Sequence, residues 1–156
     1  MTFQRRSWLV ERAAWILLGA ILVAALLGVF GGGGPAASTD RVSEDGNLSM
    51  QYDRFSRIEA PTRLRVVVTP PVEAGTTLRL WLAREYVEAL EIESILPEPS
   101  RVEAASDRYV FEFPLTAAGE TSTILFRVEP REAWHVEGRL GIDGGSELRF
   151  DQFVYP

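Results

Sequence analysis

The sequence predicts an all-β domain carried on one N-terminal helix, and three observations lead to this fold class. From Asn47 onward, apolar residues alternate with polar ones, which is the period of half-buried strands. Gly and Pro interrupt this pattern at nearly regular intervals. Before it, residues 13–30 form an apolar run without a charged residue. We therefore expect a helix at 13–30 and a β-sandwich at 47–156.

The apolar run from Ala13 to Phe30, AAWILLGAILVAALLGVF, has the length of a membrane span. Its 18 residues would form a helix of roughly 27 Å, close to the ~30 Å hydrocarbon core of a bilayer. A helix also satisfies its own backbone hydrogen bonds in lipid. We expect a single-pass transmembrane helix over residues 13–30, with the lipid bilayer as its partner.

The charge distribution gives this helix a direction. Arg5, Arg6 and Arg12 precede the run, whereas 13 arginines and 21 acidic residues, a net charge of −8, follow from Gly31 onward. Positive residues stay on the cytoplasmic side. We expect a cytoplasmic tail at 1–12, a location in the bacterial inner membrane and a periplasmic C-terminal domain. Such an acidic domain is a poor partner for nucleic acid.

A secretory signal peptide is the alternative, because it also has a basic start and an apolar region. The apolar region of a signal is usually 7–15 residues long, and GGGGPAAST contains no A-x-A cleavage site. A retained signal anchor is therefore favoured. Within it, Ala20, Ala24 and Gly28 share one helix face and could contact another helix, although small residues are frequent in any membrane helix.

Residues 31–46 are predicted to be a Gly-rich flexible linker, because four consecutive glycines cannot extend a helix at low cost. Residues 84–89 suggest a helical turn. In the last strand, Leu148 and Phe150 point away from Phe153 and Tyr155, so we expect a β-bulge or a strand covered on both faces. The expected strands have these alternating apolar residues: Leu48–Tyr52, Leu64–Val68, Leu78–Leu82, Leu90–Ile92, Tyr109–Leu115, Ile124–Val128, Trp134–Ile142 and Leu148–Phe150.

About seven or eight short strands in roughly 110 residues favour a two-layer sandwich. The arrangement resembles immunoglobulin-like and fibronectin-like domains in a general sense. It lacks the Cys…Trp…Cys spacing of true immunoglobulin domains, because the chain has no cysteine. This resemblance implies a fold and no function.

The sequence carries no catalytic or cofactor motif, and we expect neither an enzyme nor a bound metal or cofactor. Cysteine and lysine are both absent, which excludes a thiol nucleophile and a Schiff-base lysine. The only histidine, His135, is expected on a solvated face. The Asp143-to-Glu147 segment lacks the spacing of a calcium loop and indicates a hairpin turn. The densest carboxylates are expected to be solvated beside arginines: Glu88, Glu91, Glu93, Glu98 and Glu103.

Aromatic residues indicate a binding surface more clearly than His135 or the carboxylates do. Strict alternation places Trp81 opposite Leu80 and Leu82, and it places Phe153 and Tyr155 opposite the core face of the last strand. Trp and Tyr are frequent anchors of protein interfaces. These three residues are therefore candidates for a partner or ligand surface, although packing under loops of the same domain would explain them equally well.

The sequence leads to three hypotheses about function. The first is a non-catalytic accessory or interaction subunit that binds another envelope protein. The second is a membrane-tethered domain that binds a cell-wall glycan or a small envelope ligand. The third and weakest is a periplasmic hydrolase, which would depend on His135 or on a carboxylate pair.

Overall fold

The computed structural model describes residues 2–26, 38–71 and 75–156. The chain divides into two compact units, residues 1–37 and 38–156. Among these described residues, the first unit contains one helix, α1 (Thr2–Leu26), and the second contains two β-sheets and one short helix. Each unit is described below by itself.

From Ala13 onward, helix α1 exposes large apolar side chains on all its sides. Positions 15–18 are four consecutive apolar residues and span a full turn, and each side chain is between 56% and 72% exposed. Within the described residues, no helix is both long enough and apolar enough to cross a bilayer. The predicted span at 13–30 continues through residues 27–30, which lie outside the described residues. The membrane span stays a prediction.

The second unit is a β-sandwich, as the alternating pattern predicts. Sheet A has five strands in the order β1 (Ser38–Val42), β2 (Leu48–Asp53), β4 (Thr62–Val68), β9 (Ser122–Pro130) and β6 (Leu90–Leu96). Sheet B has six in the order β3 (Phe55–Arg57), β11 (Glu147–Tyr155), β10 (Trp134–Ile142), β5 (Thr77–Ala83), β8 (Arg108–Pro114) and β7 (Arg101–Ala104). Helix α2 (Arg84–Glu88) follows β5, where a helical turn was expected.

The core lies between the two sheets and is built from the alternating residues of their inner faces. On β5, Leu78, Leu80 and Leu82 are buried, and on β4 the buried apolar residues are Leu64, Val66 and Val68. Burying one side chain of this size contributes about 1.5–3 kcal/mol. This alternation explains why all eight strands expected from the sequence are present, as β2, β4, β5, β6, β8, β9, β10 and β11. The finer resemblance to immunoglobulin-like domains stays a prediction.

Three short strands were not predicted from the sequence pattern. Strand β1 lies inside the segment predicted to be a linker, and the compact unit begins at Ser38 and not at Asn47. The five residues of β1 include one apolar residue, so they are held by backbone pairing with β2 and show no alternation. Strands β3 and β7 have three and four residues and are likewise edge strands.

The phase change expected in the last strand does not occur. In β11, Leu148, Phe150, Gln152 and Val154 are all buried and follow one uninterrupted alternation. The polar Gln152 occupies an inward position, which hid this regularity in the sequence. No bulge is therefore needed to turn Phe153 outward. The only register shift in a described strand pair lies between β6 and β9, at Ile92 and Ser94.

Candidate functional site

An aromatic cluster lies on the outer face of sheet B, close to its β3 edge. It consists of Phe55 on β3, Trp134 on β10, and Phe153 and Tyr155 on β11. The rings of Phe153 and Tyr155 meet edge to face with centroids 5.0 Å apart. Phe55 stacks on Tyr155 at 6.2 Å, and Trp134 meets Phe153 edge to face at 6.2 Å. Each such pair contributes about 0.5–1.5 kcal/mol beyond its burial.

The register of sheet B brings these rings together. Strand β3 runs parallel to β11 and pairs Phe55 with Phe153. On the other side of β11, Phe153 is the cross-strand neighbour of His135. Paired residues point to the same face of a sheet. The structure thus brings together two of the three predicted surface aromatics, Phe153 and Tyr155, and adds Phe55 and Trp134.

Trp134 does not occupy the core position that alternation predicted. It pairs with Val154, whose side chain is buried, yet the Trp134 side chain is 62% exposed. Its backbone has a φ of 84°, in the left-handed region. A bulky residue in that region costs on the order of 1–3 kcal/mol. This conformation turns the indole away from the core and toward Phe153, and no sequence pattern indicates it.

Trp81, the third predicted surface aromatic, lies apart from this cluster. It points opposite the β5 leucines, as expected, but only 5% of it is exposed. The guanidinium of Arg108 lies 4.4 Å from the centre of its ring. Beside it, Trp81 pairs with Gly141, which leaves room for the indole. Trp81 is therefore covered by its own domain and contributes no surface.

A shallow groove of about 710 Å³ adjoins the cluster on the same face. Its charged side chains are mixed in sign, since Glu85, Glu137 and Asp151 line it together with Arg139 and Arg149. This mixture suits a polar protein segment more than a single anion or cation. His135 also lines the groove and connects it with the cluster through its pairing with Phe153.

His135 is exposed, as the sequence predicts, and no catalytic arrangement surrounds it in the described residues. Its Nε2 lies 3.4 Å from Oε1 of Glu137, which is its only ion-pair partner in the described part of the chain. A general base would also need a nucleophile within hydrogen-bond reach. Among the described residues, no group of three or more His, Cys, Asp and Glu side chains could hold a metal ion.

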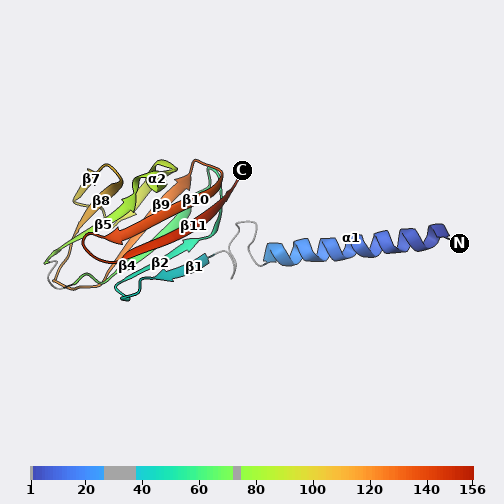
Figure 1. Ribbon diagram of the computed structural model, residues 1–156, viewed down its shortest axis with the longest axis horizontal. Helices are drawn as coiled ribbons and strands as arrows, with labels where there is room; N and C mark the ends of the chain where they lie inside the picture. The colour runs from blue at the N-terminus through green and yellow to red at the C-terminus, as the bar shows by residue number, and fades with distance from the viewer. Residues whose placement is uncertain (1, 27–37, 72–74) are drawn as a thin grey trace. The chain divides into compact units, whose positions relative to one another are not determined.

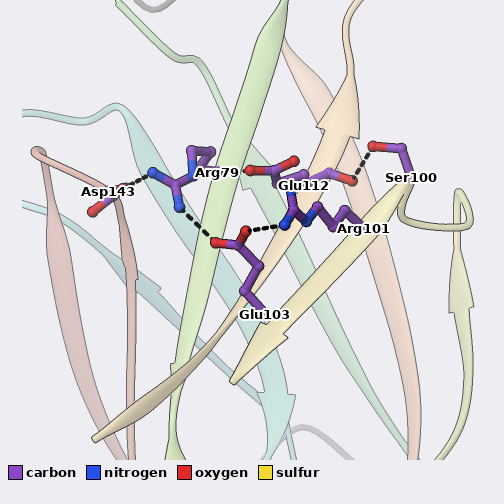
Figure 2. A network of polar contacts seen from close by, with 6 residues as sticks. All are labelled: Arg79, Ser100, Arg101, Glu103, Glu112 and Asp143. Atoms are coloured by element: carbon purple, nitrogen blue, oxygen red, sulfur yellow. Dashed lines mark hydrogen bonds and ion pairs between the residues drawn. The ribbon is translucent and has the colours of Figure 1, made fainter. Parts of the chain in front are cut away.

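A polar network on sheet B is centred on Arg79 of β5 (Figure 2). Its guanidinium contacts Asp143 at 2.7 Å, Glu103 at 3.1 Å and Glu112 at 3.2 Å. Arg101 contacts the other oxygen of Glu103 at 3.0 Å. These contacts join β5, β7, β8 and the turn after β10. The carboxylates compensate the positive charges of both arginines. We therefore interpret this network as a link between strands and not as a ligand-binding site.

Three more of the predicted carboxylates also contact arginines, whereas Glu98 is exposed and has no ion pair with an arginine among the described residues. Glu93 contacts Arg127 at 3.0 Å, Glu88 contacts Arg84 at 3.0 Å, and Glu91 contacts Arg131. The segment from Asp143 forms the hairpin turn that the sequence predicts, with Gly144 at a φ of 74°. In α1, Ala20 is exposed and Ala24 is half-buried, whereas Gly28 lies outside the described residues. The helix contact through these three residues stays a prediction.

Comparisons with known proteins give a fold likeness and no family. No protein-family model matches the chain, and no curated protein sequence matches it. A cohesin module of the family 33 glycoside hydrolase of Clostridium perfringens is similar at a TM-score of 0.45 and 12% identity, over 70% of this chain and 96% of that chain. A chain of the Coh-OlpA-Doc918 complex, a type I cohesin–dockerin complex from Clostridium thermocellum, is similar at a TM-score of 0.42 and 6% identity, over 70% of this chain and 94% of that chain. Likenesses this distant carry no argument about function.

Proposed function

We propose that this chain is a single-pass inner-membrane protein of bacteria whose periplasmic β-sandwich is a non-catalytic interaction subunit. In this proposal the domain binds another envelope protein through the aromatic cluster of Phe55, Trp134, Phe153 and Tyr155. The observation that carries it is the exposed Trp134, held outward in a left-handed backbone conformation. Strained residues are found most often at functional sites.

The composition of the cluster supports a protein partner. Trp, Tyr and Arg dominate the few residues that carry most of the binding energy of protein interfaces. Here Trp134 projects from three half-buried rings, and Arg54 and Arg57 are exposed on either side of Phe55. The charged groove beside the cluster would form the polar rim that such interfaces usually have.

The membrane tether is supported by the character of α1. A helix that is apolar on all sides needs an apolar environment on all sides. The four apolar residues at 15–18 are all exposed, and the uncharged run continues in sequence to Phe30. The arginines at positions 5, 6 and 12 support an N-terminus inside the cell.

Removal of the Trp134 ring tests the interaction. In gently solubilised native membranes, Trp134→Ala should weaken co-purification of the partner by about tenfold or more, the loss of one hot-spot side chain. Leu96→Ala is the matched control, since Leu96 is 60% exposed and lies on β6 of the other sheet. Equal recovery of the partner by both variants would contradict the proposal.

A glycan is the alternative ligand for the same rings, because a flat aromatic surface can also stack on sugars. This alternative predicts that the purified chain, without any other protein, binds isolated cell-wall fragments and loses that binding in Trp134→Ala. If the purified chain does not bind such fragments while the partner co-purifies, the protein-binding function is favoured.

A further inference from the structure

The aromatic cluster lies at the end of the β-sandwich where the chain enters from its N-terminal segment. Ser38, the first residue of the domain, pairs with Asp53 at the end of β2, and Phe55 follows two residues later. From a strand spacing of about 4.8 Å and a rise of about 3.3 Å per residue, Ser38 and Phe55 lie within roughly 15 Å. The start of β1 and the C-terminal end of β11 are at the same end of this domain (Figure 1).

Chain length limits how far this end can lie from the bilayer if residues 13–30 are anchored there. Phe30 and Ser38 are eight residues apart in sequence. Eight residues span at most roughly 30 Å, whatever their conformation. The hairpin turn at 143–146 is at the opposite end of the nine-residue strand β11, which is about 30 Å long. For a chain anchored in this way, the aromatic cluster belongs to the end of the domain whose distance from the membrane the eight residues limit.

Two arginines at this end have no partner of their own within the described part of the chain. Arg54 and Arg57 are both exposed, and neither side chain has a recorded ion pair or hydrogen bond there. The domain as a whole is acidic, with 13 arginines and 21 acidic residues from Gly31 onward. Free guanidinium groups beside an aromatic surface fit carboxylates of a partner, which they can bind with two hydrogen bonds.

A lipid surface is a less suitable partner for the aromatic cluster than a protein. Binding to a bilayer increases with the apolar area that is inserted, and of the four rings only Trp134 is mostly exposed. Anionic lipid would also repel a domain with this excess of acidic residues. A protein surface can instead pack against the half-buried rings without lifting them from the sheet.

We propose that the partner is a protein embedded in the same membrane, and that the aromatic cluster with Arg54 and Arg57 binds an acidic and apolar segment of it close to the bilayer. This inference rests on the proposed function and adds to it the partner's class, location and charge. It also means that the domain acts only on neighbours within its own membrane.

Photocrosslinking from Trp134 tests this inference in the full chain, in native membranes. A benzoylphenylalanine at position 134 should give a protein adduct that stays in the membrane after an alkaline carbonate wash. The same probe at Val102, which is 51% exposed on β7, is the control and should give no such adduct. Reversing charge in Arg54→Glu/Arg57→Glu should reduce the adduct at least about fivefold, as expected for interface arginines. The matched pair Arg63→Glu/Arg65→Glu, exposed on β4, should leave it unchanged.

Two spacers of equal length, one rigid and one flexible, test whether the bound partner lies close to the membrane. Inserted between Gly34 and Pro35, a rigid helical spacer of about 20 residues raises the domain by roughly 30 Å, whereas a Gly/Ser spacer of that length still lets it approach the membrane. The rigid spacer should remove the adduct at 134, and the flexible one should keep most of it.

Each other outcome has a definite meaning. Equal yields with both spacers, or an adduct that the carbonate wash releases, would overturn the membrane-embedded partner and leave the proposed interaction function intact. An adduct of lipid mass alone would overturn both. A yield at position 134 no higher than at Val102, together with equal recovery of the partner by Trp134→Ala and Leu96→Ala, would overturn the proposed function itself.

Discussion

Two glycines of β10 make room for aromatic rings on opposite faces of sheet B. Gly138 lies under the ring of Phe150 on the inner face, and a Cβ there would overlap the ring. Gly141 lies beside Trp81 on the outer face. Because protein interiors are close-packed, neither ring has space to move aside. These two positions are glycines for steric reasons, and neither has a positive φ.

Gly141→Ala should destabilise the domain by about 2–3 kcal/mol, as expected for an overpacked site. Its Cβ would lie 2.5 Å from Cζ2 of Trp81 and 2.8 Å from the backbone carbonyl oxygen of Ser146. Urea unfolding followed by tryptophan fluorescence measures this change. Gly145→Ala is the control, because its Cβ would meet no atom closer than 3.6 Å. A similar loss in both variants would show that the contact with Trp81 is not the cause.

Asp45 is the residue through which two hairpins of different sheets are joined. Its carboxylate accepts hydrogen bonds from the hydroxyls of Ser146 and Ser43, both at 2.5 Å, and from the backbone N–H of Asn47 at 3.3 Å. These donors, Ser146 first and Ser43 second, hold the pKa of Asp45 well below its ordinary value. The charged form is therefore the one that the fold stabilises.

This lowered pKa predicts a loss of stability in acid. A carboxyl group whose pKa is lower in the folded state contributes stability above its unfolded pKa of about 3.9, and this contribution disappears as the pH falls below that value. Urea midpoints measured between pH 6 and pH 2 should decrease less steeply in Asp45→Asn than in the unsubstituted chain. Asp40→Asn, at an exposed carboxylate of β1, should follow the unsubstituted chain. Parallel curves for all three proteins would be evidence against the role of Asp45.

At the scale of elements, one buried hydrogen-bond chain attaches α2 to sheet B. The hydroxyl of Tyr86 donates to Oε1 of Gln152 at 2.7 Å, and Nε2 of Gln152 donates to the backbone carbonyl of Asp53 at 2.8 Å. Burial raises the pKa of Tyr86, so its hydroxyl stays protonated. The ring of Tyr86 also meets Phe150 edge to face at 4.8 Å. A five-residue helix is too short to be stable alone, and Tyr86 holds it in place.

Tyr86→Phe should cost about 1–3 kcal/mol, because it leaves the buried Gln152 side chain without its donor. Chemical denaturation of the variant measures this loss. Tyr109→Phe is the matched control: this residue is half-buried on β8, and no hydrogen bond of its hydroxyl is recorded in the described structure. Its unfolding free energy should change by less than about 0.5 kcal/mol. If Tyr86→Phe were equally mild, the Tyr86–Gln152 hydrogen bond would not be what attaches α2 to the sheet.

At the scale of the whole molecule, the proposed membrane tether is tested by extraction. The full chain should remain in the membrane pellet after an alkaline carbonate wash. A Leu18→Arg/Leu22→Arg variant should be released, because each Arg at the centre of a membrane helix costs about 2.5–3.5 kcal/mol. Arg63→Ala, in the β-sandwich, serves as the control and should stay in the pellet. Release of the unsubstituted chain would contradict the tether.

The sequence predicted those parts of the fold that depend on local pattern. Eight strands and the turn of helix after β5 follow from alternation and from Gly and Pro positions. The short edge strands β1, β3 and β7 could not be predicted, because they are held by backbone pairing and bury few side chains. Of the candidate surface, alternation placed Phe153 and Tyr155 on the correct face.

The sequence by itself determined the two-sheet class, the outward face of Trp81 and the solvated position of His135, because strand period and polarity are local properties. The tertiary structure alone decided which aromatics meet. Phe55 reaches the cluster through a parallel pairing between residues about a hundred positions apart, and Trp134 reaches it through a backbone conformation opposed to its local preference. Contacts between distant segments also bury Trp81, because Arg108 covers its ring and Gly141 leaves room for it. Contacts between distant segments depend on register and close packing, and neither is encoded in a local pattern.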